Sequence, residues 1–264
     1  MGVVAPYGEK RMIFDLQKAS MWKRVSAALL DVIVLVIAVV GLAFLFSTLF
    51  NYDSYNDALN QAYATYEQEY GVVFELSMEE FEQMSPEEMQ KYETAYRALV
   101  ADSDAMYAYN MVFNLTITIA TLSILAGYLI LEFFVPGFLG NGQTIGKKIF
   151  AIAVMRTDGI KVTPPLMFIR TVLGKFTIET MIPVLIFVMI SFNSIGIVGI
   201  LILAAILILE IVLMIVTHTN SMIHDVLAKT VVVDMASQMI FDSEEEMLVY
   251  KKKVHEEYVT RQTY

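Results

Sequence analysis

The predicted fold class is an all-α membrane protein with four transmembrane helices, an extracytoplasmic helical hairpin and a small cytoplasmic β-ribbon. Two observations predict it. The 264-residue chain is 57% hydrophobic with a positive mean hydropathy, which is unusual for a soluble protein. Four apolar stretches approach or exceed the roughly 20 residues that cross a bilayer as a helix. The chain has no cysteine, which excludes disulfides, thiolate chemistry and cysteine zinc sites.

The first span is the most strongly marked segment. We assign 1–24 to a cytoplasmic lead that includes a short interfacial helix at 14–22, and 25–50 to the first transmembrane helix. A helix of that length extends about 39 Å. It contains one anion, Asp31, which lies two turns after Arg24 and therefore on the same face. A carboxylate at that depth costs several kcal/mol unless it is paired or protonated.

Residues 51–110 differ completely from the spans. They hold nine of the fourteen tyrosines and thirteen acidic residues. Two helices are predicted, at 53–70 and 86–109; Gly71 ends the first, and Ser85-Pro86-Glu87-Glu88 is a typical helix start for the second. We therefore expect an acidic extracytoplasmic helical hairpin, whose tyrosines pack between its helices. A docking surface for a protein partner is the other interpretation.

The second span is predicted at 111–135 and is followed by a cytoplasmic loop at 136–171. Within this loop, Asp158-Gly159 lies between two apolar runs, which is typical of a β-hairpin, so we expect a small two-stranded ribbon there. The apolar residues of 166–176 fall on one helical face, which favours an interfacial elbow helix before the third span.

The remaining predicted segments are a third span at 172–192, kinked at Pro183, a fourth span at 197–216 and a cytoplasmic tail at 217–264. Sixteen of the eighteen lysines and arginines fall outside 51–110. Because cytoplasmic loops are rich in Lys and Arg, this distribution puts both termini inside a bacterial cytoplasmic membrane.

Acidic residues inside the predicted spans are the strongest functional signal. They all fall in the cytoplasmic half of the membrane: Asp31, Glu132, Glu179 and Glu210. Such residues handle ions or protons, or they pair with cations of other helices. Lys175 and Glu179 are spaced i,i+4 and can neutralise each other. The candidate ion-handling site or charge network comprises Arg24, Asp31, Glu132, Arg170, Lys175, Glu179, Glu210, His224 and Asp225.

Other chemistries have weaker support. Residues 141–148 lack the first glycine and the final Ser or Thr of a phosphate-binding loop. His218 and His224 are six residues apart, which is not the spacing of a helical metal-binding pair. No serine or threonine lies near a histidine in an arrangement that suggests a nucleophile, and the acidic chain does not suit nucleic acid. We expect no enzymatic activity, metal, cofactor or nucleic-acid partner.

Four linked motifs resemble those of the RDD family of membrane proteins, named for one arginine and two aspartates. These are Arg24-x6-Asp31, Gly142-x-Thr144-x-Gly146-Lys147, Arg170, and His224-Asp225-x4-Thr230 followed by three valines. Arg24, Asp31 and Asp225 would be the three residues of the name. The resemblance covers residues 19–234, with 51–110 as an insertion.

The resemblance implies a role in transport, which some members carry out as sodium/proton exchange. It also implies that Asp225 lies near Arg24 and Arg170, with Asp31 facing them. We therefore expect transport of a cation or small solute in which Asp31 and Glu210 handle the ion, and we expect a homodimer because four spans are few. The alternative is a non-transporting accessory or scaffold protein whose charges are structural and whose outer hairpin binds a partner.

Overall fold

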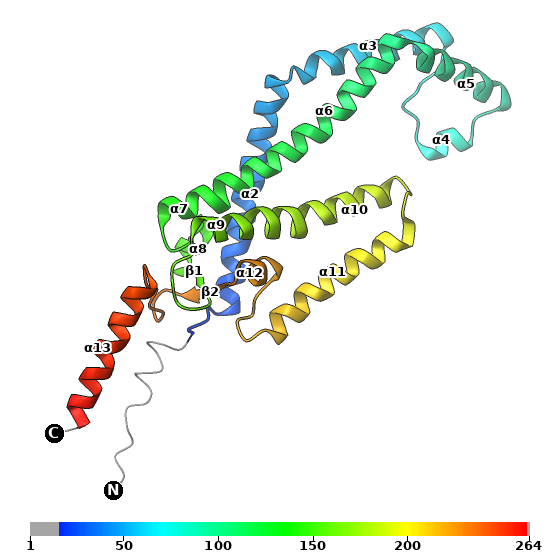
Figure 1. Cartoon of the computed structure of the whole chain (residues 1–264). Coiled ribbons are helices and arrows are strands. Elements are labelled where there is room, and N and C mark those ends of the chain that lie inside the picture. Colours follow the sequence, from blue (N-terminus) through cyan, green and yellow to red (C-terminus); the bar gives the residue numbers. More distant parts are fainter. Residues whose placement is uncertain (1–15, 263–264) are drawn as a thin grey trace. The chain divides into compact units, whose positions relative to one another are not determined.

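The computed structural model describes residues 16–262, which form two compact units (Figure 1). Unit 1 comprises residues 16–38 and 125–262, and unit 2 comprises residues 39–124. Most of the described chain is helical. Within it, four helices are long and apolar enough to cross a membrane: Met21–Leu49, Ser103–Leu139, Pro164–Ser191 and Gly196–Val216.

Unit 2 consists of helices only, within the described chain. It contains the second part of α2 (Met21–Leu49), α3 (Tyr52–Tyr70), α4 (Met78–Glu82), α5 (Pro86–Ala101) and most of α6 (Ser103–Tyr128). Gly71 ends α3 as expected, in the left-handed region at φ 64°. Ser85 caps α5 by accepting a hydrogen bond from the Glu88 backbone N–H, while the Glu88 carboxylate accepts from that of Ser85.

Aromatic residues join the helices of unit 2. The ring of Phe74 lies 5.8 Å from that of Tyr63 and 5.7 Å from that of Tyr92. The predicted 86–109 helix is divided at Asp102, whose backbone is extended. Its carboxylate accepts hydrogen bonds from the backbone N–H groups of Asp104 and Ala105, so a new helix begins there.

Unit 1 holds the remaining elements. After α6 come η1 (Leu129–Phe134), α7 (Val135–Leu139), α8 (Ile145–Ile149), β1 (Ile152–Arg156), α9 (Pro164–Phe168), η2 (Ile169–Met181), α10 (Ile182–Ser191), α11 (Gly196–Val216), α12 (Ile223–Ala228), β2 (Thr230–Asp234) and α13 (Glu244–Gln262). The segments η1 and η2 are π-helical. Residues 164–191 form one continuous helix, so the predicted elbow helix is not a separate element from the third span.

The two-stranded sheet of unit 1 corrects the expected ribbon. Asp158-Gly159 does form a turn, and the Arg156 N–H donates to the Ile160 carbonyl. However, the strand that pairs with β1 along its whole length is β2, antiparallel, with Ile152 opposite Asp234 and Arg156 opposite Thr230. β2 is an apolar strand whose burial is favourable. It therefore pairs with β1 in preference to the short, lysine-containing segment 160–163.

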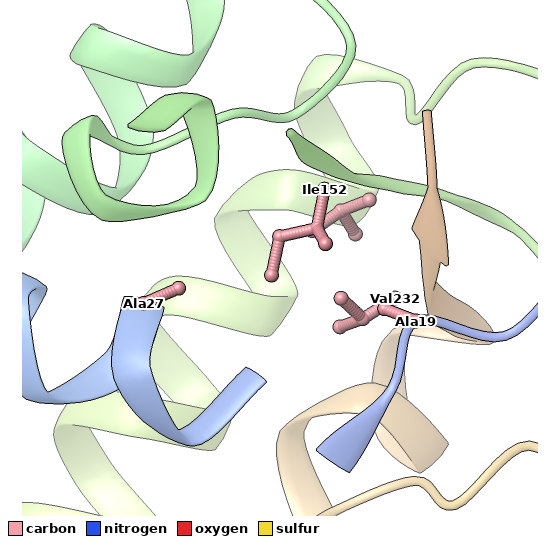
Figure 2. Close-up of a cluster of buried hydrophobic side chains, with 5 residues drawn as sticks. Ala19, Ala27, Ile152 and Val232 are labelled. Carbon is pink, nitrogen blue, oxygen red and sulfur yellow. The ribbon is translucent and has the colours of Figure 1, made fainter. Parts of the chain in front are cut away.

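A small apolar core ties α2 to this sheet (Figure 2). Ala27 of α2, Ile152 of β1 and Val232 of β2 are buried together with Ala19. The Ala19 N–H donates to the Val232 carbonyl, so the chain before α2 runs along the edge of β2. The interfacial helix expected at 14–22 is therefore wrong for residues 16–20, which are not helical, while residues 14 and 15 lie outside the described part of the chain.

Candidate functional site

The two π-helical segments carry four of the charged residues of the site. Glu132 lies in η1, and η2 holds Arg170, Lys175 and Glu179. A π-helix has a wider turn than an α-helix, so side chains four apart no longer lie on one line. The expected Lys175–Glu179 pair is accordingly replaced, because Lys175 pairs with Glu132 and Glu179 contacts His224.

Asp31 binds the loop that follows the second apolar helix. Its carboxylate accepts hydrogen bonds from the Thr144 hydroxyl at 2.5 Å and from the Gly146 backbone N–H at 2.7 Å. The Lys147 ammonium lies 3.5 Å from its Oδ2. A Cβ at Gly146 would meet the backbone carbonyl of Ala27 and would lie 2.9 Å from Asp31 Oδ1. Asp31 thus holds the start of α8 directly against α2.

Glu132 is a shared anion for three cations. It is 6% exposed. Its Oε1 accepts from the Lys175 ammonium at 2.5 Å, and its Oε2 lies 3.7 Å from Lys147 Nζ and 4.0 Å from Arg170 Nη1. Among the described residues, no donor is within hydrogen-bonding distance of Oε2. One oxygen of this buried carboxylate is therefore neutralised by charge but not hydrogen-bonded.

Asp225 is the second shared anion, and it is 1% exposed. Its Oδ1 accepts from Arg170 Nε and from the Thr230 hydroxyl at 3.1 and 2.9 Å. Its Oδ2 lies 3.6 Å from Arg24 Nη2, and no described donor hydrogen-bonds it. The expected approach of Asp225 to Arg24 and Arg170 is thus present in the structure, whereas Asp31 faces Lys147 instead of the arginines.

His224 links the tail to Glu179 and lies close to Glu210. The His224 backbone N–H donates to Glu179 at 2.8 Å, and its Nδ1 is 2.8 Å from both carboxylate oxygens. A Cβ at Gly174 would lie 2.5 Å from His224 Cβ, so the backbone of η2 lies directly against α12. Glu210 of α11 accepts from the Ile223 N–H at 3.3 Å through Oε2, and its Oε1 has no hydrogen-bond partner among the described residues.

Burial and charge shift the titration of the residues outside the spans. Burial lowers the pKa of Lys147 to about 8, against the raising effect of Glu132. Burial alone would raise the pKa of Asp225, but Arg170, His224 and Arg24 together hold that pKa well below its usual range. Burial also lowers the pKa of His224. Asp225 is therefore ionised at neutral pH, and burial favours the neutral form of His224.

A cavity of about 480 Å³ reaches this charged layer within unit 1. Its apolar lining includes Val25, Leu29 and Val32 of α2. Its lining also includes charged and imidazole side chains: Arg24 and Asp31 of α2, and Glu132, Lys147, Arg170, Lys175, Glu179, His224 and Asp225 from other elements. The volume is in the range of small-molecule binding sites.

Eight of the nine charged residues singled out in the sequence therefore line one cavity, and Glu210 lies beside it. Two members of the site were not among them, namely Lys147 and Thr144. Both belong to the Gly142–Lys147 motif, which was the signal that could have identified them. Its glycines are explained by the close approach of α8 to α2 at Gly146 and by a left-handed φ of 60° at Gly142.

Four helices that are long and apolar enough to cross a membrane point to a multi-pass membrane protein. The family model for the RDD family matches residues 18–229. The chain therefore belongs to the RDD family. In comparisons with curated proteins and with solved structures, no significant match is found.

Proposed function

We propose that this protein transports a small solute or a cation across the membrane through the cavity of unit 1. The observation that supports the proposal is the cavity itself, which lies within unit 1 against buried charged residues of its apolar helices. If the buried ion pairs only stabilised the helix bundle, no cavity would be expected beside them, because protein interiors are normally close-packed.

The hydrogen bonds suggest how the acidic residues divide their roles. Asp31 is bonded by Thr144 and Gly146, so in this proposal it anchors the loop rather than binding the transported species. The oxygens with spare acceptor capacity belong to Glu132, Asp225 and Glu210. In the cation version of the proposal, including sodium/proton exchange, these oxygens are the ones that receive the ion or proton.

The orientation is also part of the proposal. The excess of lysine and arginine outside 51–110 supports both termini and the charged layer on the cytoplasmic side of a bacterial membrane, with α3 to α5 outside. Cysteines introduced singly at the exposed residues Val73 and Val249, and labelled by an impermeant reagent on intact cells, test this orientation. Labelling at Val249 but not at Val73 would refute it.

The transport proposal is tested by filling the cavity without changing any charge. Ala28 lines the cavity and Val36, two turns later in α2, does not. We expect Ala28→Phe to abolish uptake by proteoliposomes and Val36→Phe to leave it unchanged. The measured species are sodium, driven by a proton gradient and followed with a sodium-sensitive dye, and radiolabelled zwitterionic amino acids. Equal uptake by both variants and the wild type, or no uptake at all, would refute transport through this cavity.

A scaffold role is the second candidate. It is favoured because Asp225 and Asp31 are each closely paired with other residues of the protein, Asp225 with Arg170 and Asp31 with Lys147. In that case α3 to α5 would hold a partner, and α2, of which only Ala27 is fully buried, would contact a second copy or another protein. The mass of the protein in nanodiscs, measured by mass photometry, tests the homodimer. If the wild type transports and its mass is that of a monomer, a scaffold in which α2 contacts a second copy is excluded.

A further inference from the structure

The lining of the cavity is balanced in charge. Four carboxylates and four basic side chains, two arginines and two lysines, face it, and His224 adds an imidazole. A ligand with a net charge would upset this balance in a region of low dielectric, where an uncompensated charge is costly. A ligand with both signs, or with none, would not.

The negative groups of the lining have unused acceptors. Glu132 Oε2 and Asp225 Oδ2 belong to side chains that are more than nine-tenths buried, and neither accepts a hydrogen bond from a described residue. The nearest basic nitrogen to Asp225 Oδ2 is His224 Nε2 at 3.5 Å, followed by Arg24 Nη2 at 3.6 Å; those nearest to Glu132 Oε2 are 3.7 and 4.0 Å away. None of them hydrogen-bonds either oxygen. Arg170 lies between them, with Nη2 3.1 Å from Asp225 and Nη1 4.0 Å from Glu132. Both oxygens therefore lack an N–H or O–H donor.

The positive groups have unused donors. An ammonium has three N–H groups, and within the described chain Glu132 Oε1 is the single acceptor that hydrogen-bonds the Lys175 ammonium. The Lys175 side chain is 16% exposed, the most of the four cations in the lining. It is the cation best placed to receive an anionic group of a ligand.

The apolar part of the lining suits a carbon chain. Val25, Leu29 and Val32 line the cavity and are each more than half exposed, so the cavity continues onto the apolar surface of α2. In a bilayer this surface meets acyl chains, so a ligand can have an apolar part or can itself be a lipid.

We propose that the cavity binds a zwitterion in which a primary ammonium stands close to an anionic group. The ammonium donates to Glu132 Oε2, and the anionic group accepts from Lys175, which hydrogen-bonds the other oxygen of the same carboxylate. This inference deepens the proposed function by naming the ligand class, and it rests on the same cavity. The zwitterion has two available sources, a free solute or the headgroup of an aminophospholipid.

The test is a set of matched probes titrated calorimetrically into the full-length wild-type protein in a lipid-free detergent at about pH 5. At that pH a phosphate monoester, whose second pKa is about 6, carries close to one negative charge. O-phosphoethanolamine is expected to bind. O-phosphocholine has the same charges but no N–H donors. It should bind at least about ten-fold more weakly, which is the effect of losing one hydrogen bond to a charged group. Ethanolamine and inorganic phosphate, each with one charge, should also be at least about ten-fold weaker. Equal binding of phosphocholine or of phosphate, or no binding of any probe, would overturn the proposal.

Native mass spectrometry separates the two sources. Retention of phosphatidylethanolamine over phosphatidylcholine, reversed by O-phosphoethanolamine, identifies the lipid headgroup. Binding of the free compound without lipid retention identifies a soluble ligand. Both results support the shared chemistry.

The cavity itself is tested with the two α2 variants. Ala28→Phe should weaken O-phosphoethanolamine binding at least about ten-fold, and Val36→Phe should not. Unchanged binding by a folded Ala28→Phe protein would overturn the location. Binding without uptake in proteoliposomes would leave this inference intact and refute transport, whereas sodium uptake without zwitterion binding would do the reverse.

Discussion

Units 1 and 2 are stabilised in different ways. In unit 2 aromatic and apolar side chains make the contacts between helices. Its capping hydrogen bonds join residues close in the sequence at the start of one helix, as between Ser85 and Glu88. In unit 1 the buried contacts include, beside the apolar core of the sheet, ion pairs between residues far apart in the sequence, such as Arg24 with Asp225. Arg97 and Glu93 form the ion pair described in unit 2, and both side chains are more than half exposed.

This difference shows where removal of one charged group matters. An exposed pair contributes little, because water solvates either partner when the other is removed. A buried pair leaves an uncompensated charge. Unit 1 should therefore be sensitive to single charge changes, and unit 2 should be sensitive to loss of aromatic packing.

The largest expected effect is that of Asp225→Ala. It leaves the buried guanidinium groups of Arg170 and Arg24 without their shared carboxylate. We expect a loss of about 3–5 kcal/mol in the free energy of unfolding, measured by thermal unfolding in detergent. Glu93→Ala is the matched control in unit 2, with an expected change under about 1 kcal/mol. Similar losses for the two variants would contradict the contrast between the units.

Next comes Gly146→Ala, which tests the close contact of α8 with α2. The new methyl group would overlap the Ala27 carbonyl and press on Asp31, and neither can move freely. We expect a loss of about 1–3 kcal/mol by the same assay. Gly41→Ala, at a position within α2 where a Cβ would have nothing within 4 Å, is the control and should cause no loss. A stable Gly146→Ala protein would show that the loop is not held where the structure puts it.

For unit 2, Phe74→Ala removes ring contacts with Tyr63 and Tyr92. Two aromatic pairs contribute about 1–2 kcal/mol beyond buried area. The expected result is faster hydrogen exchange of α3 and α5 amides in the full-length protein. Val73→Ala, at the exposed neighbouring position, serves as the control. If exchange does not change in Phe74→Ala, aromatic packing is not what holds unit 2.

The smallest expected effect is a pH dependence that originates in unit 1. The folded protein binds a proton at His224 less readily than the unfolded chain, because burial lowers the pKa of the imidazole. As pH falls through about 6.5 the unfolded state gains a proton that the folded state does not, so stability decreases. The expected contribution of His224 to this loss is about 1 kcal/mol between pH 7.5 and 5.5, measured as the difference in thermal unfolding between the wild type and His224→Gln.

Two comparisons check this assignment. The pKa of Asp225 lies far below this range, so Asp225 contributes nothing to the slope. His224→Gln should flatten the dependence. An unchanged slope in that variant would mean that another group titrates.

Local features of the sequence were sufficient for much of the fold. The apolar runs predicted the four membrane-spanning helices, and Gly71 and Ser85 marked helix ends correctly. The division of the predicted 86–109 helix was missed because Asp102 caps a new helix inside a sequence with good helix formers throughout. The ribbon was paired wrongly because a turn signal at Asp158-Gly159 says nothing about a strand more than seventy residues later.

The sequence by itself determined which segments form helices that are long and apolar enough to cross a membrane, and which charged residues these helices contain. Hydropathy and helix length depend only on residues that are neighbours in the sequence. The tertiary structure decided the partner of each charge: Lys147 for Asp31, Lys175 for Glu132 and His224 for Glu179. These choices depend on the wider turn of the π-helical segments and on backbone approaches at Gly146 and Gly174, which no local pattern encodes.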